Sequence, residues 1–170
     1  MTNAPITNTT TDKVCPLWRR LLALVYDLVA VLAIVMVVGL VCQLATHGEL
    51  ISTGAQVHIA WWYQPLQALV VAAYFVFSWL RGGQTLGMRP WRIRVTTGHG
   101  LPPSLRQALV RVIVAALPLT LLLLAPTFGL RVALEAVAAG WVIWFALALF
   151  DRRRRAVHDL AAGTEIHRLG

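Results

Sequence analysis

The chain has 170 residues, of which 58% are hydrophobic and only 13% are charged, whereas a typical soluble domain carries about 25% charged residues. Together with a mean hydropathy of +0.69, this composition excludes an ordinary soluble protein, because too few polar side chains remain to cover the apolar ones. It also excludes a disordered chain, which needs low hydrophobicity. Fifteen Lys and Arg against seven Asp and Glu give a net charge of +8. In a membrane protein such an excess indicates topology rather than binding of nucleic acid.

The first predicted elements are a polar tail and a transmembrane helix. Residues 1–16 begin with a stretch rich in Thr and Asn and predict a disordered tail. Residues 21–42 are apolar except for Tyr26 and Asp27, and their number suits a helix across a bilayer core, which needs about 20 residues. Fourteen Leu, Ile and Val side chains in this segment outweigh the cost of one Asp, about 3 kcal/mol at the centre of a span. A signal peptide is the rejected alternative, because its apolar region is shorter and ends in a small-x-small cleavage site.

Three further apolar segments predict three more spans. Residues 61–80 begin with Trp-Trp-Tyr and end near another tryptophan, as expected for aromatic side chains at both membrane interfaces. Residues 107–125 contain Pro118, which predicts a kink because proline lacks the backbone N–H, and residues 132–150 form the last span. The alternatives are a three-span chain with one long bent helix from 107 to 150, or one span plus an interfacial helix. We favour two spans, because a continuous helix of this length would measure about 66 Å, twice the bilayer core.

The basic residues lie almost entirely on one side of these four spans. All fifteen Lys and Arg except Arg131 precede the first span, follow the last, or lie in or beside the loop formed by residues 81–106. Short loops rich in Lys and Arg stay in the cytoplasm, so we expect both termini and this loop to be cytoplasmic. The sequence therefore predicts an all-α membrane protein with four transmembrane helices. Its basic side suits anionic lipid head groups, because each Lys or Arg near an anionic membrane surface is attracted by about 1 kcal/mol.

The predicted cytoplasmic loop, residues 81–106, has structure of its own. Residues 91–95 alternate apolar and basic side chains, which is typical of a short strand, and residues 97–100 read Thr-Gly-His-Gly, which predicts a turn. A strand followed by a turn predicts a short β-hairpin in this loop. Ser104 is the predicted N-cap of the third span.

Asp27 is the first candidate functional residue, because it is ionisable and lies about two turns inside the first span. Arg20 precedes it by seven residues, which places both side chains on one helix face, about 10 Å apart along the axis. Ionisable groups in a membrane usually face the interior of the bundle and have a partner. Two interpretations stay open: a titratable or ion-binding site, and a structural carboxylate bonded to another span or to backbone.

A second set of candidates follows the predicted second span at helical spacing: Gln64, Gln67, Tyr74 and Ser78. Polar side chains avoid lipid, so we expect this stripe to face the interior of the bundle. It would line a hydrated path or form hydrogen bonds between helices.

Asp159 is the third ionisable candidate, and it follows the fourth span. Arg20 precedes the first span, and antiparallel spans bring these two positions together. We therefore predict a polar cluster at the membrane boundary that contains Arg20 and at least one of Asp27 and Asp159. The alternative is that Asp159 only caps a helix or turn before Gly163.

No segment predicts catalysis. Residues 152–155 are four arginines directly after an apolar span, which favours lipid contact over nucleic acid. The His158–Asp159 pair lacks the further ligands that metal-assisted hydrolysis needs. Two cysteines at opposite ends of the first span are too few for a disulfide framework or a zinc site. The sequence thus predicts no enzymatic activity, metal or cofactor.

Three segments resemble the RDD family of bacterial membrane proteins. Residues 20–27 resemble its Arg-x-x-Ala-x-x-x-Asp opening, residues 83–87 with the following Ile93-Arg94-Val95 resemble its Gly-x-Thr-x-Gly loop, and residues 158–164 resemble its closing His-Asp-x-x-x-Gly-Thr. Met88 departs from the lysine that often follows the second glycine of the loop. The arginine and the two aspartates that name the family fall here at Arg20, Asp27 and Asp159.

The resemblance covers residues 17–168 and implies an RDD-like transmembrane domain in the bacterial inner membrane. Some members are linked to cation–proton exchange, and others resemble accessory domains. One hypothesis is therefore a small cation/proton transporter or transport subunit that uses Asp27, with a homo-oligomer or another membrane protein as partner, because four short helices leave little room for a pathway. The other is a non-transporting membrane scaffold or assembly partner, with a basic cytoplasmic face that binds lipid or protein.

Overall fold

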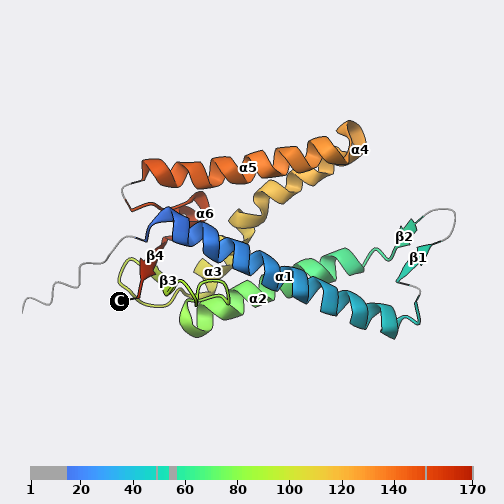
Figure 1. The fold of residues 1–170 in the computed structure, drawn as a ribbon, viewed down its shortest axis with the longest axis horizontal. Coiled ribbons are helices and arrows are strands. Elements are labelled where there is room, and N and C mark those ends of the chain that lie inside the picture. Colours follow the sequence, from blue (N-terminus) through green and yellow to red (C-terminus); the bar gives the residue numbers. More distant parts are fainter. Residues whose placement is uncertain (1–14, 49, 54–56, 152, 170) are drawn as a thin grey trace, which may run out of the picture.

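The computed structural model describes residues 15–48, 50–53, 57–151 and 153–169. Residues 1–14 of the predicted tail lie outside the described residues, as does Arg152 of the four consecutive arginines. The described chain is mostly helical and carries two small antiparallel sheets (Figure 1).

Four helical segments of the described chain are long and apolar enough to cross a membrane: Leu17–Ala45, Tyr63–Gly82, Leu105–Phe128 and Leu130–Phe150. The first, second and fourth are α1, α2 and α5, and the third combines α3 (Leu105–Ala116), η1 (Leu117–Leu124) and α4 (Ala125–Phe128). The prediction of four spans is confirmed. The three-span alternative is wrong, because the chain reverses at Gly129 and α5 runs back along η1 (Figure 1).

Apolar side chains cover the outside of these helices. Leu28, Met36 and Leu44 of α1, for example, are exposed in the isolated chain. A soluble domain would bury such a continuous apolar surface, whereas lipid acyl chains cover it at no cost. The composition and the exposed surface therefore agree on a membrane location.

The helix type changes next to Pro118, where the sequence predicts a kink. The α-helical backbone of α3 ends at Ala116, and η1 continues with 3₁₀ geometry. Pro118 has no N–H to donate to the carbonyl of Ala115, three residues earlier. The indole Nε1–H of Trp141, on α5, donates to this carbonyl instead, at 3.2 Å. One side chain of the fourth span thus satisfies a backbone acceptor of the third.

The sheets do not follow the sequence prediction. Strands β1 (Ile51–Thr53) and β2 (Val57–Ile59) form a hairpin between α1 and α2. The predicted hairpin within the loop 81–106 is wrong, because this loop contributes only β3 (Ile93–Thr97), which pairs with β4 (Thr164–Arg168) of the C-terminal segment.

A local cause explains this difference. The chain turns after β3, where Gly100 N–H donates to the carbonyl of Thr97 at 2.9 Å. The next residues include Pro102 and Pro103, which have no N–H for a strand ladder. The C-terminal β4 supplies the missing partner, with Val95 opposite Ile166, and both of these side chains are buried.

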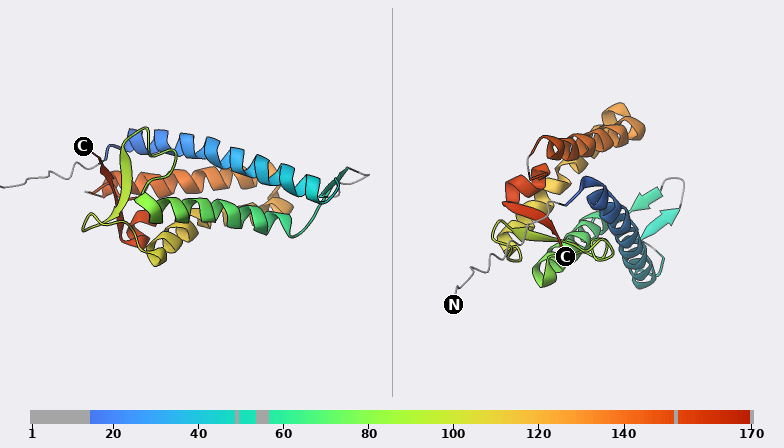
Figure 2. Two further views of the ribbon diagram at one scale, coloured as in Figure 1. Left: turned by 90° about the horizontal axis from the view of Figure 1, so that it is seen from below. Right: turned by 60° about the vertical axis from the view of Figure 1, so that its left-hand side comes forward.

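One end of the bundle carries this second sheet. We call it the sheet end, defined by β3, β4 and α6 (Val157–Ala162), and we call the end with β1 and β2 the hairpin end. The start of α1 and the end of β4 both lie at the sheet end (Figures 1 and 2), as an even number of spans requires. That the sheet end faces the cytoplasm stays a prediction.

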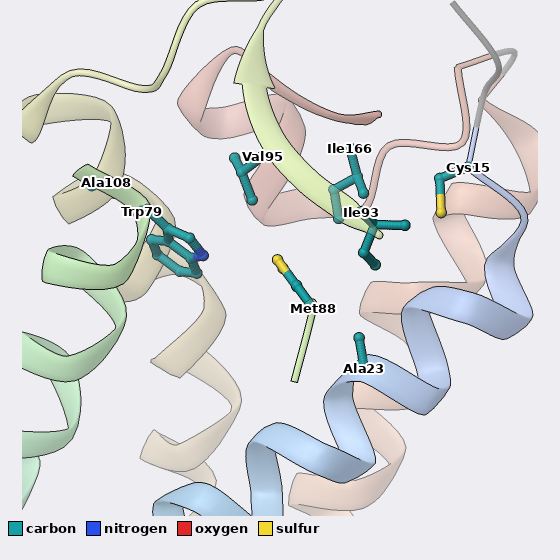
Figure 3. Packing of buried hydrophobic residues seen from close by; sticks show 8 residues of the cluster. All are labelled: Cys15, Ala23, Trp79, Met88, Ile93, Val95, Ala108 and Ile166. Atoms are coloured by element: carbon teal, nitrogen blue, oxygen red, sulfur yellow. The ribbon is translucent and has the colours of Figure 1, made fainter. Parts of the chain in front are cut away.

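The hydrophobic core of the chain lies under the sheet. It consists of buried side chains from the segment before α1, from α1, α2, α3 and the loop, and from both strands of the second sheet (Figure 3): Cys15, Ala23, Trp79, Met88, Ile93, Val95, Ala108 and Ile166. From the sheet end the α1–α2 pair and the η1–α5 pair diverge (Figure 1). The sheet end is therefore where loop, tail and helix ends pack together.

Candidate functional site

A buried carboxylate joins three helices at the sheet end. Asp159 of α6 is fully buried and accepts hydrogen bonds from Arg20 of α1 through Oδ2 and from Arg111 of α3 through Oδ1. Arg20 also donates to the carbonyl of Arg154, and Arg111 donates to Oγ1 of Thr164 at 2.8 Å. Asp159 thus connects the first and third spans to the C-terminal segment.

The short helix α6 fixes the position of Asp159. Its Oδ2 also accepts the N–H of Ala156, at the start of α6, at 3.0 Å. Both sequence interpretations of Asp159 therefore apply at once, because one carboxylate caps a helix and forms the ion pairs. On the third span, the guanidinium of Arg111 lies 4.9 Å from the ring centre of Trp79, which is within cation–π range.

The charges around Asp159 determine the ionisation of this cluster. Burial raises the pKa of Asp159, but the positive charges of Arg111 and Arg20 outweigh burial and hold the pKa well below its ordinary value. Burial, helped by the charge of Arg111, lowers the pKa of the neighbouring His158 to about 3. At neutral pH the cluster therefore contains two guanidiniums, one carboxylate and a neutral imidazole, with a net charge of one positive unit.

Asp27 occupies a separate polar site further along α1. Its Oδ1 accepts the hydroxyl of Tyr74 at 3.0 Å and the N–H of Gly87 at 2.9 Å, and its Oδ2 accepts the hydroxyl of Thr85 at 2.5 Å. The carboxylate is 3% exposed. One donor comes from α2 and two come from the loop, so Asp27 binds the loop to the bundle.

Glycine makes this close approach of loop and helix possible. A Cβ on Gly87 would lie 2.2 Å from the carbonyl oxygen of Ala23 and 2.7 Å from the carboxyl carbon of Asp27. Gly83 ends α2 with a φ of +70°, and a Cβ there would lie 2.4 Å from the carbonyl oxygen of Val95. The Gly-x-Thr-x-Gly segment therefore needs both of its glycines for steric reasons, and it needs Thr85 as a donor.

The model of one protein family, described as the RDD family, matches residues 14–163. The chain belongs to the RDD family. The match includes Arg20, Asp27, Asp159 and the loop that holds Asp27, which confirms the resemblance seen in the sequence. Comparisons with curated proteins and with solved structures gave no match.

In this RDD chain the predicted contact between Arg20 and Asp159 is confirmed. Asp27 does not join that contact, because its described partners are the hydroxyls and the amide of other elements. Arg20, Ala23 and Asp27 are the buried residues of α1, and their spacing places them on one helix face. The common face was thus predicted correctly, but it carries two polar sites instead of one. A ligand-binding role for these residues stays a prediction.

Arg111 is the important residue that the sequence interpretation missed. Its position in the sequence suggests only a basic residue that flanks the third span, although it lies among apolar residues of α3 and is 2% exposed. An ionisable residue in such a position needs a partner as much as Asp27 does. This signal was present in the sequence and would have pointed to a carboxylate such as Asp159.

The secondary candidates on α2 of the RDD chain do not form one stripe. Gln67 donates to the carbonyl of Val35 on α1 at 3.0 Å and to the hydroxyl of Tyr63 at 2.6 Å, and Tyr74 donates to Asp27. These two side chains connect helices. Gln64 is exposed, contrary to the predicted inward position, and Ser78 is half-buried. Within the described chain neither of the latter two forms a side-chain hydrogen bond.

Proposed function

We propose that this RDD-family membrane protein is a non-transporting scaffold or assembly partner whose basic sheet end binds anionic lipid head groups. One observation carries this proposal: the buried carboxylates Asp27 and Asp159 have their hydrogen-bond donors within the chain, whereas several exposed arginines at the same end form no ion pair with a described carboxylate.

The surroundings of Asp27 support a structural role for this carboxylate. All three of its hydrogen-bonding neighbours, Tyr74, Thr85 and Gly87, act as donors. Ca²⁺ and Mg²⁺ are held by several oxygen acceptors, often two or more carboxylates. Among the described residues no three His, Cys, Asp or Glu side chains gather into a metal-binding group. The donors around Asp27 therefore suit a carboxylate that binds the loop to the bundle better than a site that loads and releases a cation.

The exposed arginines support the lipid-binding part of the proposal. Six exposed arginines of the loop, the adjoining helix ends and the C-terminal segment form no ion pair with a described carboxylate: Arg81, Arg89, Arg92, Arg106, Arg154 and Arg168. The anionic surface of a cytoplasmic leaflet attracts such residues by about 1 kcal/mol each. With the sheet end in the cytoplasm of a bacterium, this face lies against the head groups of the inner membrane.

Transport of a cation or proton through Asp27 is the second candidate function. The observation that favours it is the depth of an ionisable carboxylate that is 3% exposed on a membrane span and bonded to the hydroxyl of Tyr74. Buried acids of this kind form proton relays in pumps and transporters. In this case the protein would act as an oligomer, because a pathway needs more surface than four short helices offer.

Proton flux in liposomes distinguishes the two functions. Purified protein is reconstituted into vesicles that contain a pH-sensitive dye, and Na⁺ or K⁺ is added outside. The scaffold proposal predicts the same response as in vesicles without protein. Flux that is lost in Asp27→Asn and kept in Glu135→Gln, which removes an exposed acid instead, would support transport and contradict the scaffold. The melting temperature of each variant in detergent shows whether it is folded.

A further inference from the structure

Four arginines from three segments surround the start of α1. Arg19 donates to the carbonyl of Trp91 at 3.4 Å, which brings α1 against the residues before β3. Arg20 donates to the carbonyl of Arg154. In the second sheet Arg168 lies opposite Ile93. These contacts place Arg19, Arg20, Arg154 and Arg168 at one corner of the sheet end.

Cys15 lies at the same corner. Cys15 is buried beside Ile93 and Ile166 (Figure 3). Burial raises the pKa of this thiol, and four positive charges oppose the rise: those of Arg20, Arg19, Arg168 and Arg154. Arginines from three segments thus lie near this thiol, although only Arg20 and Arg19 are neighbours in the sequence.

The described carboxylates do not neutralise this corner. Those of the sheet end are already engaged: Asp159 with Arg20 and Arg111, Asp151 with Arg155, and Glu165 with Arg153. Asp27 lies two turns along α1 from Arg20, about 10 Å by helix geometry, and binds neutral donors. Asp159 compensates one charge for two buried arginines, so the corner keeps an excess of positive charge.

Two buried donors at this corner have no acceptor among the described residues. The side chain of Arg20 is 5% exposed, and its Nε–H is buried without a hydrogen-bond partner, as is the Nε–H of the half-buried Arg19. A buried donor without an acceptor costs about 1–3 kcal/mol. An anion with several acceptor oxygens could accept both N–H groups, and a phosphate group matches the planar fork of an arginine.

We propose that Arg19, Arg20, Arg154 and Arg168 form a binding site for one phosphate group, carried by an anionic lipid or free in solution. This inference rests on the proposed lipid-binding sheet end and gives it a defined site. Arg20 forms the buried floor, and the exposed Arg154 and Arg168 form the entrance. Trp18 lies beside Arg19, is 52% exposed and packs edge-on against Trp91. Such tryptophans mark head-group depth, which favours the lipid as the source.

Native mass spectrometry of the whole protein in detergent tests the site with three separate probes: phosphatidylglycerol, phosphatidylcholine and inorganic phosphate. We expect one tightly bound phosphatidylglycerol per chain and weaker binding of phosphatidylcholine. The double variant Arg154→Gln/Arg168→Gln changes two exposed entrance residues and leaves the buried ion pairs in place. We expect it to weaken this binding at least about tenfold. The control Arg89→Gln/Arg106→Gln removes the same charge from exposed arginines of the basic face outside the site, so it should weaken binding of this one lipid less than the entrance variant does.

The outcomes separate this site from the proposed function. One inorganic phosphate per chain, lost in the entrance variant and kept in the control, would also support the site and would identify free phosphate as its ligand. An equal loss of lipid binding in both double variants would overturn the site and would leave a diffuse basic face that binds lipid. No preference for phosphatidylglycerol in any folded variant, with no phosphate bound, would overturn both proposals.

Discussion

Arg111 of the third span and Asp159 of the C-terminal segment form an ion pair in which neither side chain is more than 2% exposed. The two residues are 48 positions apart, and Arg20 of the first span reaches the same carboxylate. Removal of one member of a buried pair costs about 3–5 kcal/mol, because the partner stays buried with its charge. The C-terminal segment is therefore a structural part of the membrane domain.

Substitution of Gly87 tests whether the loop must touch α1. The Cβ in Gly87→Ala would overlap the backbone of Ala23, so we expect the loop to move away from Asp27 and the protein to lose about 1–3 kcal/mol of stability. The control is Gly98→Ala, because a Cβ at Gly98 would have its nearest neighbour 4.0 Å away. Thermal unfolding in detergent measures both variants. Equal melting temperatures would show that the loop does not need this contact.

His158 makes stability depend on pH. Its pKa falls from 6.5 to about 3 on folding, so below pH 6.5 the unfolded chain binds a proton that the folded chain does not bind. The neutral imidazole contributes fully to the free energy of unfolding above pH 6.5. This contribution is lost as the pH falls toward 3, by up to about 1.4 kcal/mol for each pH unit.

We therefore expect the melting temperature to fall between pH 7 and pH 4 and to fall less steeply in His158→Gln. The depressed pKa of Asp159 adds a second loss only below the ordinary pKa of an aspartate, about 3.9. The pKa of Glu165 is lowered from 4.5, so its contribution is lost only as the pH falls below about that value. Measurements at pH 5 and above thus isolate the histidine. Parallel curves for the two proteins would contradict the burial of a neutral His158.

Cysteine labelling tests the topology. In a background without Cys15 and Cys42, we introduce single cysteines at Ala60, His99 and Arg168. The structure places β3, β4 and the start of α1 at one end and the β1–β2 hairpin at the other (Figure 2). We expect His99 and Arg168 to react from the cytoplasmic side and Ala60 from the other side. Labelling of His99 and Arg168 from opposite sides would contradict the four-span arrangement.

The spans were predictable because hydropathy is a local property of the sequence. The segment from 21 to 42, for example, lies within α1, and Pro118 marks the change of helix type in the third span. The contact of Arg20 with Asp159 was also predictable, because their depth beside antiparallel spans and the family resemblance pointed to it.

The remaining features depend on contacts between distant segments. Strand β3 has a local signature, but nothing near Val95 indicates that its partner is Ile166. The spacing of Arg20 and Asp27 fixes a common helix face and does not reveal that Tyr74, Thr85 and Gly87 saturate Asp27. Arg111 was counted only as a charge for topology, and its role follows from the position of α6 beneath it.

The central claim is that Asp159 ties the first and third spans together, and a double-mutant cycle tests it most directly. We expect Asp159→Asn to lower the free energy of unfolding in detergent by about 3–5 kcal/mol. Asp151→Asn, which breaks the half-exposed pair with Arg155, should cost less than about 1 kcal/mol. Arg20→Gln should add little to the loss in Asp159→Asn, because both changes remove one interaction. Additive losses, or equal losses in Asp159→Asn and Asp151→Asn, would contradict this account.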